Sequence, residues 1–172
     1  MIAIHKRSRC CSTFLFCVVV FVIQMSASAL AGGYDNALKG VNNYDAVFEV
    51  TQGNPEIANI VFWAVRNAYQ VSEVKGLARA PSVAIVFHGP AVKLLSADKT
   101  PFNGAQWAEV EKFQQTLREM KADGVKLEIC LYAAKVMGVD RATILPEIDQ
   151  VGNGFVSVIG YQMQGYAVVR IP

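Results

Sequence analysis

The chain has 172 residues, with 16 Lys and Arg against 14 Asp and Glu, and 53% of its residues are hydrophobic. Three of the basic residues, Lys6, Arg7 and Arg9, lie near the N-terminus, so the remainder carries 13 basic and 14 acidic residues. This near-neutral remainder has no Lys/Arg cluster interleaved with aromatic residues, which argues against nucleic acid and anionic membrane surfaces as partners. Its length suits one domain with a single core.

The N-terminal segment has the pattern of a secretory signal peptide. The basic residues precede an uncharged apolar run over residues 14–23, which is short for a membrane span. Small-x-small patterns predict cleavage after Ala29 or Ala31. We therefore expect residues 1–31 to be a signal peptide and cleavage region, and the mature protein to be periplasmic with no stable membrane association. A retained signal anchor is the alternative.

Cleavage would remove Cys10, Cys11 and Cys17 and leave Cys130 as the only cysteine. One cysteine cannot form an internal disulfide. In an oxidising compartment, a lone thiol is buried and inert, paired between chains, or kept for chemistry.

Residues 32–44 are polar and rich in Gly and Asn, which predicts a flexible lead-in to a folded domain over residues 45–172. Residues 46–50 have the composition of a strand. A helix should follow, with Asn54 as its N-cap and Pro55 at its first position. The residues expected to face a sheet recur at steps of three and four: Ile57, Ile60, Val61, Ala64, Val65 and Ala68.

The rest of the chain alternates between strand and helix patterns. Strands are predicted at residues 82–87, 126–130, 148–151 and 166–171, and helices at residues 91–97, 107–122, 131–138, 141–145 and 155–163. This alternation predicts a mostly parallel five-stranded sheet with helices on both faces, a three-layer α/β sandwich.

Cys130 lies where a predicted strand ends and a predicted helix begins. At such a junction, free backbone N–H groups and the positive end of the helix dipole favour the thiolate, which is the geometry of a reactive cysteine. The alternative is that Cys130, between Ile129 and Leu131, is a small core hydrophobe.

His88 follows the strand at residues 82–87, and ligands of open parallel sheets gather at such strand ends. If the two strands are neighbours, His88 could polarise Cys130. Alternatively, His88, Gly89 and Pro90 form a turn and the imidazole is bonded to backbone. Lys93 is a candidate ligand-binding residue that could attract an anionic thiolate or a sulfur oxyanion; alternatively, it is a solvated lysine. Gly89 is the second candidate ligand-binding residue.

The sequence gives little support to a metal or cofactor. One cysteine and one histidine lack carboxylate partners at ligand spacing, so no metal ligand is assigned. Gly152-Asn153-Gly154 is too short for a phosphate-binding fingerprint. We expect no cofactor.

Four segments together resemble the DsrE/DsrF-like family, specifically its single-domain, exported branch. They are FEVTQGNPEIANIVFWAVRNAY, VAIVFHGPAVKLLSAD, GVKLEICLYAAKVMGVDRATILPEI and VSVIGYQMQGYAVVRI, in this order from about Asp45 to the C-terminus. The resemblance implies a flavodoxin-like fold that assembles into homotrimers or homohexamers. It also implies that Cys130 matches the cysteine that carries sulfur as a persulfide in the sulfur-relay members.

Two functions follow from these expectations. In the first, Cys130 accepts sulfane sulfur from a donor protein or small sulfur species in the periplasm and transfers it to an acceptor. In the second, the protein is a non-catalytic oligomeric module for ligand binding or assembly, with Cys130 packed in the core. Accessibility of Cys130 near His88 distinguishes them.

Overall fold

The computed structural model describes residues 33–172. The predicted signal peptide, its cleavage sites and the other three cysteines lie outside these residues. The chain from Gly40 to Pro172 forms one compact unit, and the described residues 33–39 are not part of it. In these residues, the chain makes a turn in which the Leu38 amide donates to the Tyr34 carbonyl at 2.8 Å.

The larger unit is built around a five-stranded sheet with the order β4-β3-β2-β1-β5. Its strands are β1 (Asp45–Val50), β2 (Ser82–Phe87), β3 (Lys126–Cys130), β4 (Asp149–Val151) and β5 (Ala167–Ile171). Every neighbouring pair is parallel, so the expected mostly parallel sheet is in fact entirely parallel. The predicted α/β fold is confirmed.

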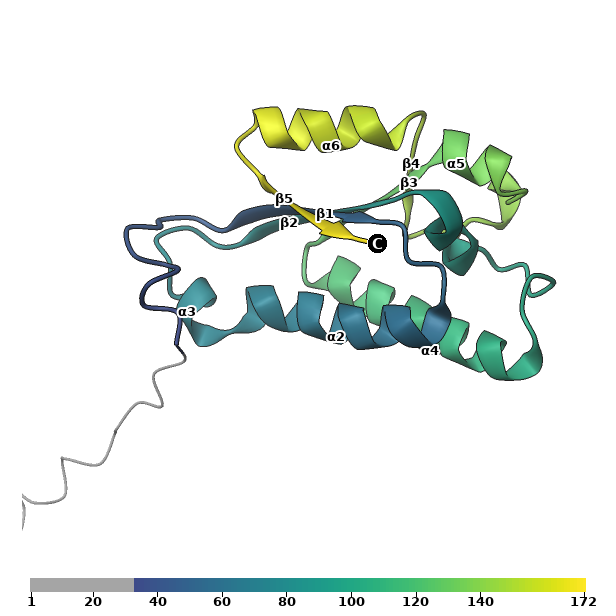
Figure 1. The fold of residues 1–172 in the computed structure, drawn as a ribbon, viewed down its shortest axis with the longest axis horizontal. Helices are drawn as coiled ribbons and strands as arrows, with labels where there is room; N and C mark the ends of the chain where they lie inside the picture. The colour runs from purple at the N-terminus through teal and green to yellow at the C-terminus, as the bar shows by residue number, and fades with distance from the viewer. Residues whose placement is uncertain (1–32) are drawn as a thin grey trace, which may run out of the picture. The chain divides into compact units, whose positions relative to one another are not determined.

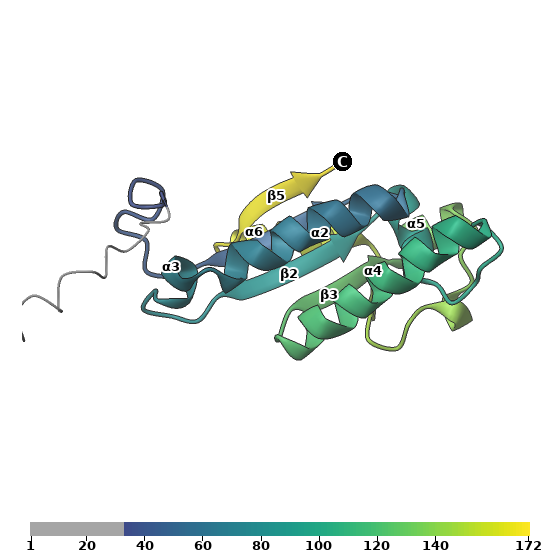
Figure 2. The ribbon, with the colours of Figure 1, turned by 90° about the horizontal axis from the view of Figure 1, so that it is seen from below.

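Helices cover both faces of the sheet (Figure 1). They are α2 (Pro55–Gln70), α3 (Ser72–Lys75), α4 (Gly104–Ala122), α5 (Leu131–Val136) and α6 (Gly154–Met163), with 3₁₀ segments η1 (Gly89–Leu95) and η2 (Arg141–Thr143). Helices α2 and α4 lie side by side on one face, as Figure 2 shows, and α6 lies on the other. The sheet is thus the middle of three layers.

The helix ends follow the local sequence signals. The Asn54 side chain caps α2 by accepting from the amides of Glu56 and Ile57 at 2.9 and 3.1 Å. Asn103 and Gln106 form a capping box at the start of α4. After α4, Gly124 has a φ of +89°, a conformation that favours glycine. The helix expected at residues 91–97 is instead the 3₁₀ segment η1, and α3 was not predicted.

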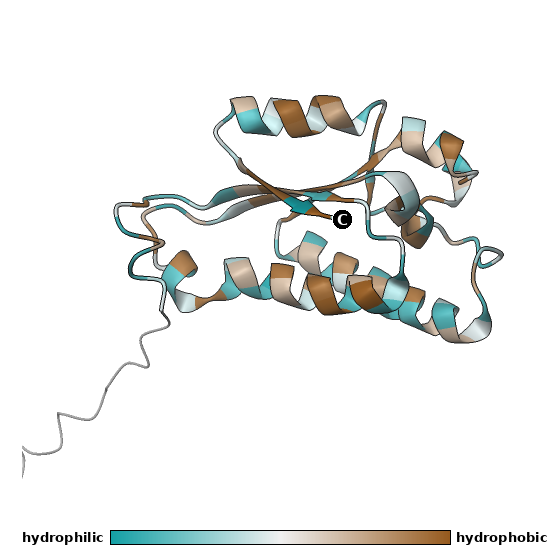
Figure 3. Ribbon diagram, viewed as in Figure 1, coloured by the Kyte–Doolittle hydropathy of each residue, from teal (hydrophilic) through white to brown (hydrophobic). Residues whose placement is uncertain are grey.

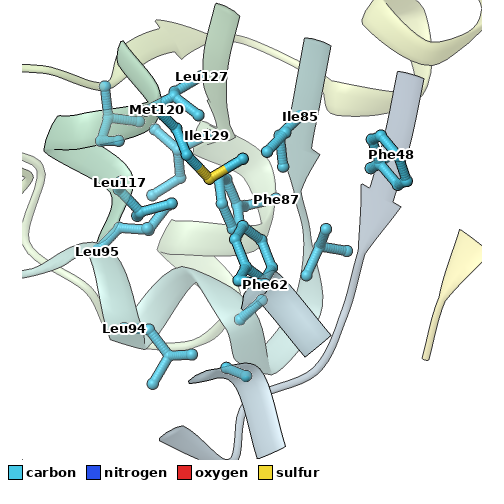
Figure 4. Close-up of a cluster of buried hydrophobic side chains, with 14 of the residues drawn as sticks. Phe48, Phe62, Ile85, Phe87, Leu94, Leu95, Leu117, Met120, Leu127 and Ile129 are labelled. Atoms are coloured by element: carbon cyan, nitrogen blue, oxygen red, sulfur yellow. The ribbon is translucent and has the colours of Figure 1, made fainter. Parts of the chain in front are cut away.

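The main core lies between the sheet and the α2–α4 layer (Figure 4). At its centre, the Phe62 ring meets the Phe113 ring edge to face, with centroids 4.7 Å apart, and stacks on the Phe87 ring at 5.8 Å. These three aromatic side chains join α2, α4 and β2, so burial of their apolar surface fixes the positions of both helices on the sheet.

The prediction of which face of α2 packs on the sheet is wrong. Its buried residues are Pro55, Ala58, Phe62, Val65 and Tyr69. Of the six residues expected to face the sheet, only Val65 is buried, and Ile60 is 71% exposed. The helix carries two overlapping apolar stripes, and the one that contains the large rings of Phe62 and Tyr69 packs inward because it buries more apolar surface.

The opposite face of the sheet has a thinner core. Val47, Ala84 and Val86 point toward α6, where Val158 and Tyr161 pack against them. Figure 3 shows further hydrophobic residues along α6, and four of them are exposed: Phe155, Val156, Ile159 and Met163. Among the helices of residues 33–172, none has both the length and the apolar character needed to cross a membrane.

Candidate active site

The candidate residues lie at the carboxyl edge of the sheet, where β2, β3 and β4 end. Because the strands are parallel, the residues that follow them meet at the same edge. The chain leaves β2 through η1 toward α4, and leaves β3 through α5 on the side of α6 (Figure 1). Neighbouring strands whose connections diverge in this way leave a crevice between their ends, and His88 and Cys130 border it.

Cys130 ends β3 and is the N-cap of α5, as the sequence predicted. Its Sγ accepts a hydrogen bond from the Ala133 amide at 3.4 Å. The side chain is a free thiol, and the residue is only 3% exposed in the single chain. The hydrogen bond orients the sulfur at the edge of the sheet, and α5, with six residues, is too short to act as an anion site by itself.

His88 is held by its backbone between β1 and η1. Its amide donates to the Val50 carbonyl at 2.8 Å, and its carbonyl accepts from the Ala91 amide at 3.2 Å. Within residues 33–172, no backbone group bonds to the imidazole, in contrast to one of the two sequence-based alternatives. Its Nε2 is buried and has no hydrogen-bond partner among the described residues.

The electrostatic surroundings keep the His88 imidazole neutral. Burial lowers its pKa from the ordinary value of 6.5, because the charged form loses hydration. The carboxylate of Glu49, whose Oε1 lies 4.0 Å from Nε2, opposes this effect and raises the pKa, but the effect of burial is larger. His88 is therefore uncharged at neutral pH.

Gly154, the first residue of α6, lies between His88 and Cys130. A Cβ at this position would be 2.6 Å from Cε1 of His88 and 3.0 Å from Cβ of Cys130. No side chain fits in this space without displacing one of them. The absence of a side chain at Gly154 is thus what allows the two candidate residues to approach each other.

A cavity of about 300 Å³ opens beside these residues. It is lined by His88, Gly89, Cys130, Tyr132, Ala133, Val136, Met137, Asn153 and Phe155. The structure brings together three of the four predicted site residues, His88, Gly89 and Cys130. Lys93, on η1, does not line the cavity.

Phe155 and Asn153 are site residues that sequence reasoning did not identify. The Phe155 ring lies against the His88 imidazole, with centroids 5.0 Å apart. Asn153 caps α6 by accepting from the Phe155 amide at 3.0 Å. Both follow β4, so their position after a parallel strand was the available signal, but the sequence did not show that β4 lies beside β3.

Two other features of the described residues do not form a competing active site. A larger hollow of about 530 Å³ on the outer side of α2 and α4 contains no cysteine or histidine. Within residues 33–172, no group of three or more His, Cys, Asp or Glu side chains is close enough to hold a metal ion.

The arrangement is suited to chemistry at sulfur. A thiol beside a neutral imidazole can attack an electrophilic sulfur atom, and the surrounding apolar side chains limit access of water. Burial of Cys130 restricts the reaction to a partner that enters the cavity.

Comparison with known proteins agrees with this fold. The chain is similar to the protein of unknown function MTH1491 from Methanobacterium thermoautotrophicum, with 19% identity, a TM-score of 0.57, and coverage of 74% of this chain and 98% of that one. It is also similar to the ychN protein from E. coli, with 16% identity, a TM-score of 0.49, and coverage of 74% and 99%. No curated protein matches the sequence. The DsrE/DsrF-like family, which is associated with sulfur relay, matches residues 45–171, and the chain therefore belongs to this family.

Proposed function

We propose that the protein is a sulfur-relay protein in which Cys130 accepts sulfane sulfur as a persulfide and passes it to an acceptor. The observation that carries the proposal is that Cys130 and the buried His88 imidazole border the same cavity. A thiol attacks the outer sulfur of a polysulfide, the S–S bond breaks, and the shortened polysulfide leaves with the thiol proton. The reaction consumes no oxidant, because sulfane sulfur is transferred without net electron loss.

Intact-protein mass spectrometry tests this proposal. Wild type and Cys130→Ser are exposed to polysulfide, alkylated, and mapped by peptide so that a modification at Cys130 is separated from any other cysteine. We expect a gain of about one sulfur mass on the Cys130 peptide, reversed by reductant and absent from the variant. Loading elsewhere, with Cys130 unmodified, would contradict the proposal.

The alternative function, a non-catalytic binding or assembly module, is favoured by one observation. Cys130 is 3% exposed, as a core cysteine would be. If Cys130 resists both polysulfide and an alkylating agent until the protein is unfolded, the thiol is a packing residue and this alternative replaces sulfur transfer.

We also propose that copies of the chain assemble through α6, whose ten residues include no charged side chain. Its exposed residues Val156, Ile159 and Met163 form an apolar surface of the kind that a partner usually covers. The family resemblance favours a second copy of this chain as that partner. Light scattering after size exclusion should give a trimer or hexamer, and Ile159→Asp should dissociate it, whereas Gln164→Asp, at the C-cap of the same helix and away from this surface, should not.

Export is the remaining part of the proposal, and it is supported by the basic and apolar pattern of residues 1–31. After expression in a Gram-negative host, the mass of the periplasmic protein should correspond to a start after Ala29 or Ala31. Recovery of the uncleaved chain from membranes would instead support a signal anchor.

A further inference from the structure

The cavity at Cys130 has an apolar lining with no charged side chain. Its walls are the side chains of Tyr132, Ala133, Val136, Met137 and Phe155. The polar groups of the lining residues are those of Cys130, His88 and Asn153, the Tyr132 hydroxyl, and backbone atoms. A ligand in this cavity gains affinity chiefly by burying apolar surface.

The charges around the cavity are unfavourable to an anionic sulfur donor. Lys93 on η1 and Lys135 on α5 belong to the adjacent elements, but neither lines the cavity. The carboxylate of Glu49 lies 4.0 Å from His88. A dianion such as thiosulfate would lose hydration in this cavity without meeting a cation, which costs free energy.

The size of the cavity limits the ligand as well. A volume of about 300 Å³ is at the lower end of the range for small-molecule sites, so a nucleotide-sized group does not fit. Cys130 is almost fully buried, and the sulfur to be transferred must therefore enter the cavity on a slender group.

His88 is a second polar side chain, besides the cysteine, that borders the space a ligand would occupy. The His88 side chain lines the cavity and is 94% buried, and its Nε2 has no hydrogen-bond partner among the described residues. Nε2 faces the Glu49 carboxylate at 4.0 Å and has almost no accessible surface, so a ligand beside Cys130 would meet the Cε1–Nδ1 edge of the imidazole, which is the edge that lies toward Gly154.

We propose that the sulfur donor at Cys130 is a small organic hydropersulfide, R–S–SH, in which R is an uncharged apolar group. This inference rests on the proposed function and specifies its substrate class. The R group packs against Val136, Met137 and Phe155, while the terminal sulfur meets Cys130.

The transfer step balances without a further reactant. The Cys130 thiol loses its proton, and its sulfur attacks the terminal sulfur of R–S–SH. A new S–S bond forms to Cys130, the R–S to SH bond breaks, and R–S⁻ leaves and takes up the proton to give R–SH. The products are a Cys130 persulfide and a thiol.

The test compares three donors on the purified protein: benzyl hydropersulfide, glutathione hydropersulfide and thiosulfate. The rate at which each loads Cys130 is measured by peptide mass spectrometry and divided by its rate with N-acetylcysteine methyl ester, which corrects for intrinsic reactivity. We expect the corrected rate for the benzyl donor to be at least about tenfold above both others, which corresponds to about 1.4 kcal/mol.

A charge variant tests whether the cavity causes this preference. Val136→Lys adds a cation at an exposed position of the lining and should raise the corrected rate for thiosulfate and lower that for the benzyl donor. Gln162→Lys adds the same charge on α6 outside the lining and should change neither rate. Equal shifts in both variants would assign the effect to net charge and overturn the inference.

The two proposals fail in different ways. If neither polysulfide nor any of the three donors loads Cys130, the proposed function fails and the substrate class fails with it. If all donors load Cys130 at equal corrected rates, or thiosulfate is fastest, sulfur transfer stands and the apolar donor is excluded.

Discussion

The Phe155 ring covers the His88 imidazole, with ring centroids 5.0 Å apart and planes inclined by 32°. Phe155 is on α6 and His88 follows β2, so this contact joins helix α6 to the carboxyl edge of the sheet. Both residues line the cavity beside Cys130. We therefore expect this contact to affect how readily the cavity admits a reagent.

The first prediction concerns access to Cys130. Phe155→Ala removes the ring from the cavity wall and should raise the alkylation rate of the Cys130 thiol by iodoacetamide about fivefold, as expected if opening becomes easier by about 1 kcal/mol. Met163→Ala removes an apolar side chain from the same helix outside the cavity lining and is the control. Equal rates for the two variants would show that Phe155 does not limit access.

The second prediction concerns the charge of His88. In an NMR titration, assigned by comparison with His88→Asn, the pKa of His88 should lie below 6.5 because burial disfavours the imidazolium. Since Glu49 raises this pKa, Glu49→Gln should lower it further. Glu147→Gln, which removes a carboxylate paired with Arg118, is the control and should leave it unchanged. A rise in Glu49→Gln would contradict the assignment.

The same shift predicts a pH dependence of stability. Below pH 6.5, His88 is protonated in the unfolded chain but remains neutral in the folded chain, because burial lowers its pKa. The free energy of unfolding should therefore fall as the pH drops from 6.5 to the pKa of the folded state. Urea unfolding of wild type and His88→Asn measures this, with a slope of at most about 1.4 kcal/mol per pH unit for one proton. The contribution is absent above pH 6.5, where both states are neutral.

The strand-end positions of His88 and Cys130 were predictable because they depend on local sequence. A continuous apolar run sets β2, an alternating run sets β3, and parallel strands bring their ends to one edge. Their contact at Gly154 was not predictable. It depends on the pairing of β4 with β3 and on the position of α6 over the sheet. No local sequence pattern indicates either of these two arrangements.

The inner face of α2 shows a second limit of sequence reasoning. Residues at steps of three and four occur on two neighbouring stripes, one through Ile60 and the other through Phe62. Periodicity alone does not rank the two, because both satisfy the helical repeat. The choice depends on the space left by Phe87 and Phe113, which belong to other elements.

The third prediction follows from the observed face of α2. Phe62→Ala should lower the free energy of unfolding by about 3–5 kcal/mol, since it empties the centre of the aromatic cluster. Trp63→Ala removes a larger side chain that is 75% exposed and should cost less than about 1 kcal/mol. Urea unfolding at one protein concentration compares them, and a larger loss in Trp63→Ala than in Phe62→Ala would contradict the observed packing of α2.

The fourth prediction compares the effect on stability of an alanine at Gly154, beside the site, with that of an alanine at Gly160, elsewhere on the same helix. Gly154→Ala should destabilise the protein by about 1–3 kcal/mol, because the added methyl group collides with His88 and Cys130. Gly160→Ala, on the same helix, meets no atom within 4 Å and should stabilise it by about 0.5–1 kcal/mol through helix propensity. Thermal unfolding measures both.

The two glycine variants should also differ in sulfur loading. If Gly154→Ala folds, His88 or Cys130 must move to make room, and loading of Cys130 by polysulfide should slow, whereas Gly160→Ala should load like wild type. A stable Gly154→Ala protein with unchanged loading would show that the approach of His88 to Cys130 is not required. That outcome would contradict a role of His88 in the reaction of Cys130.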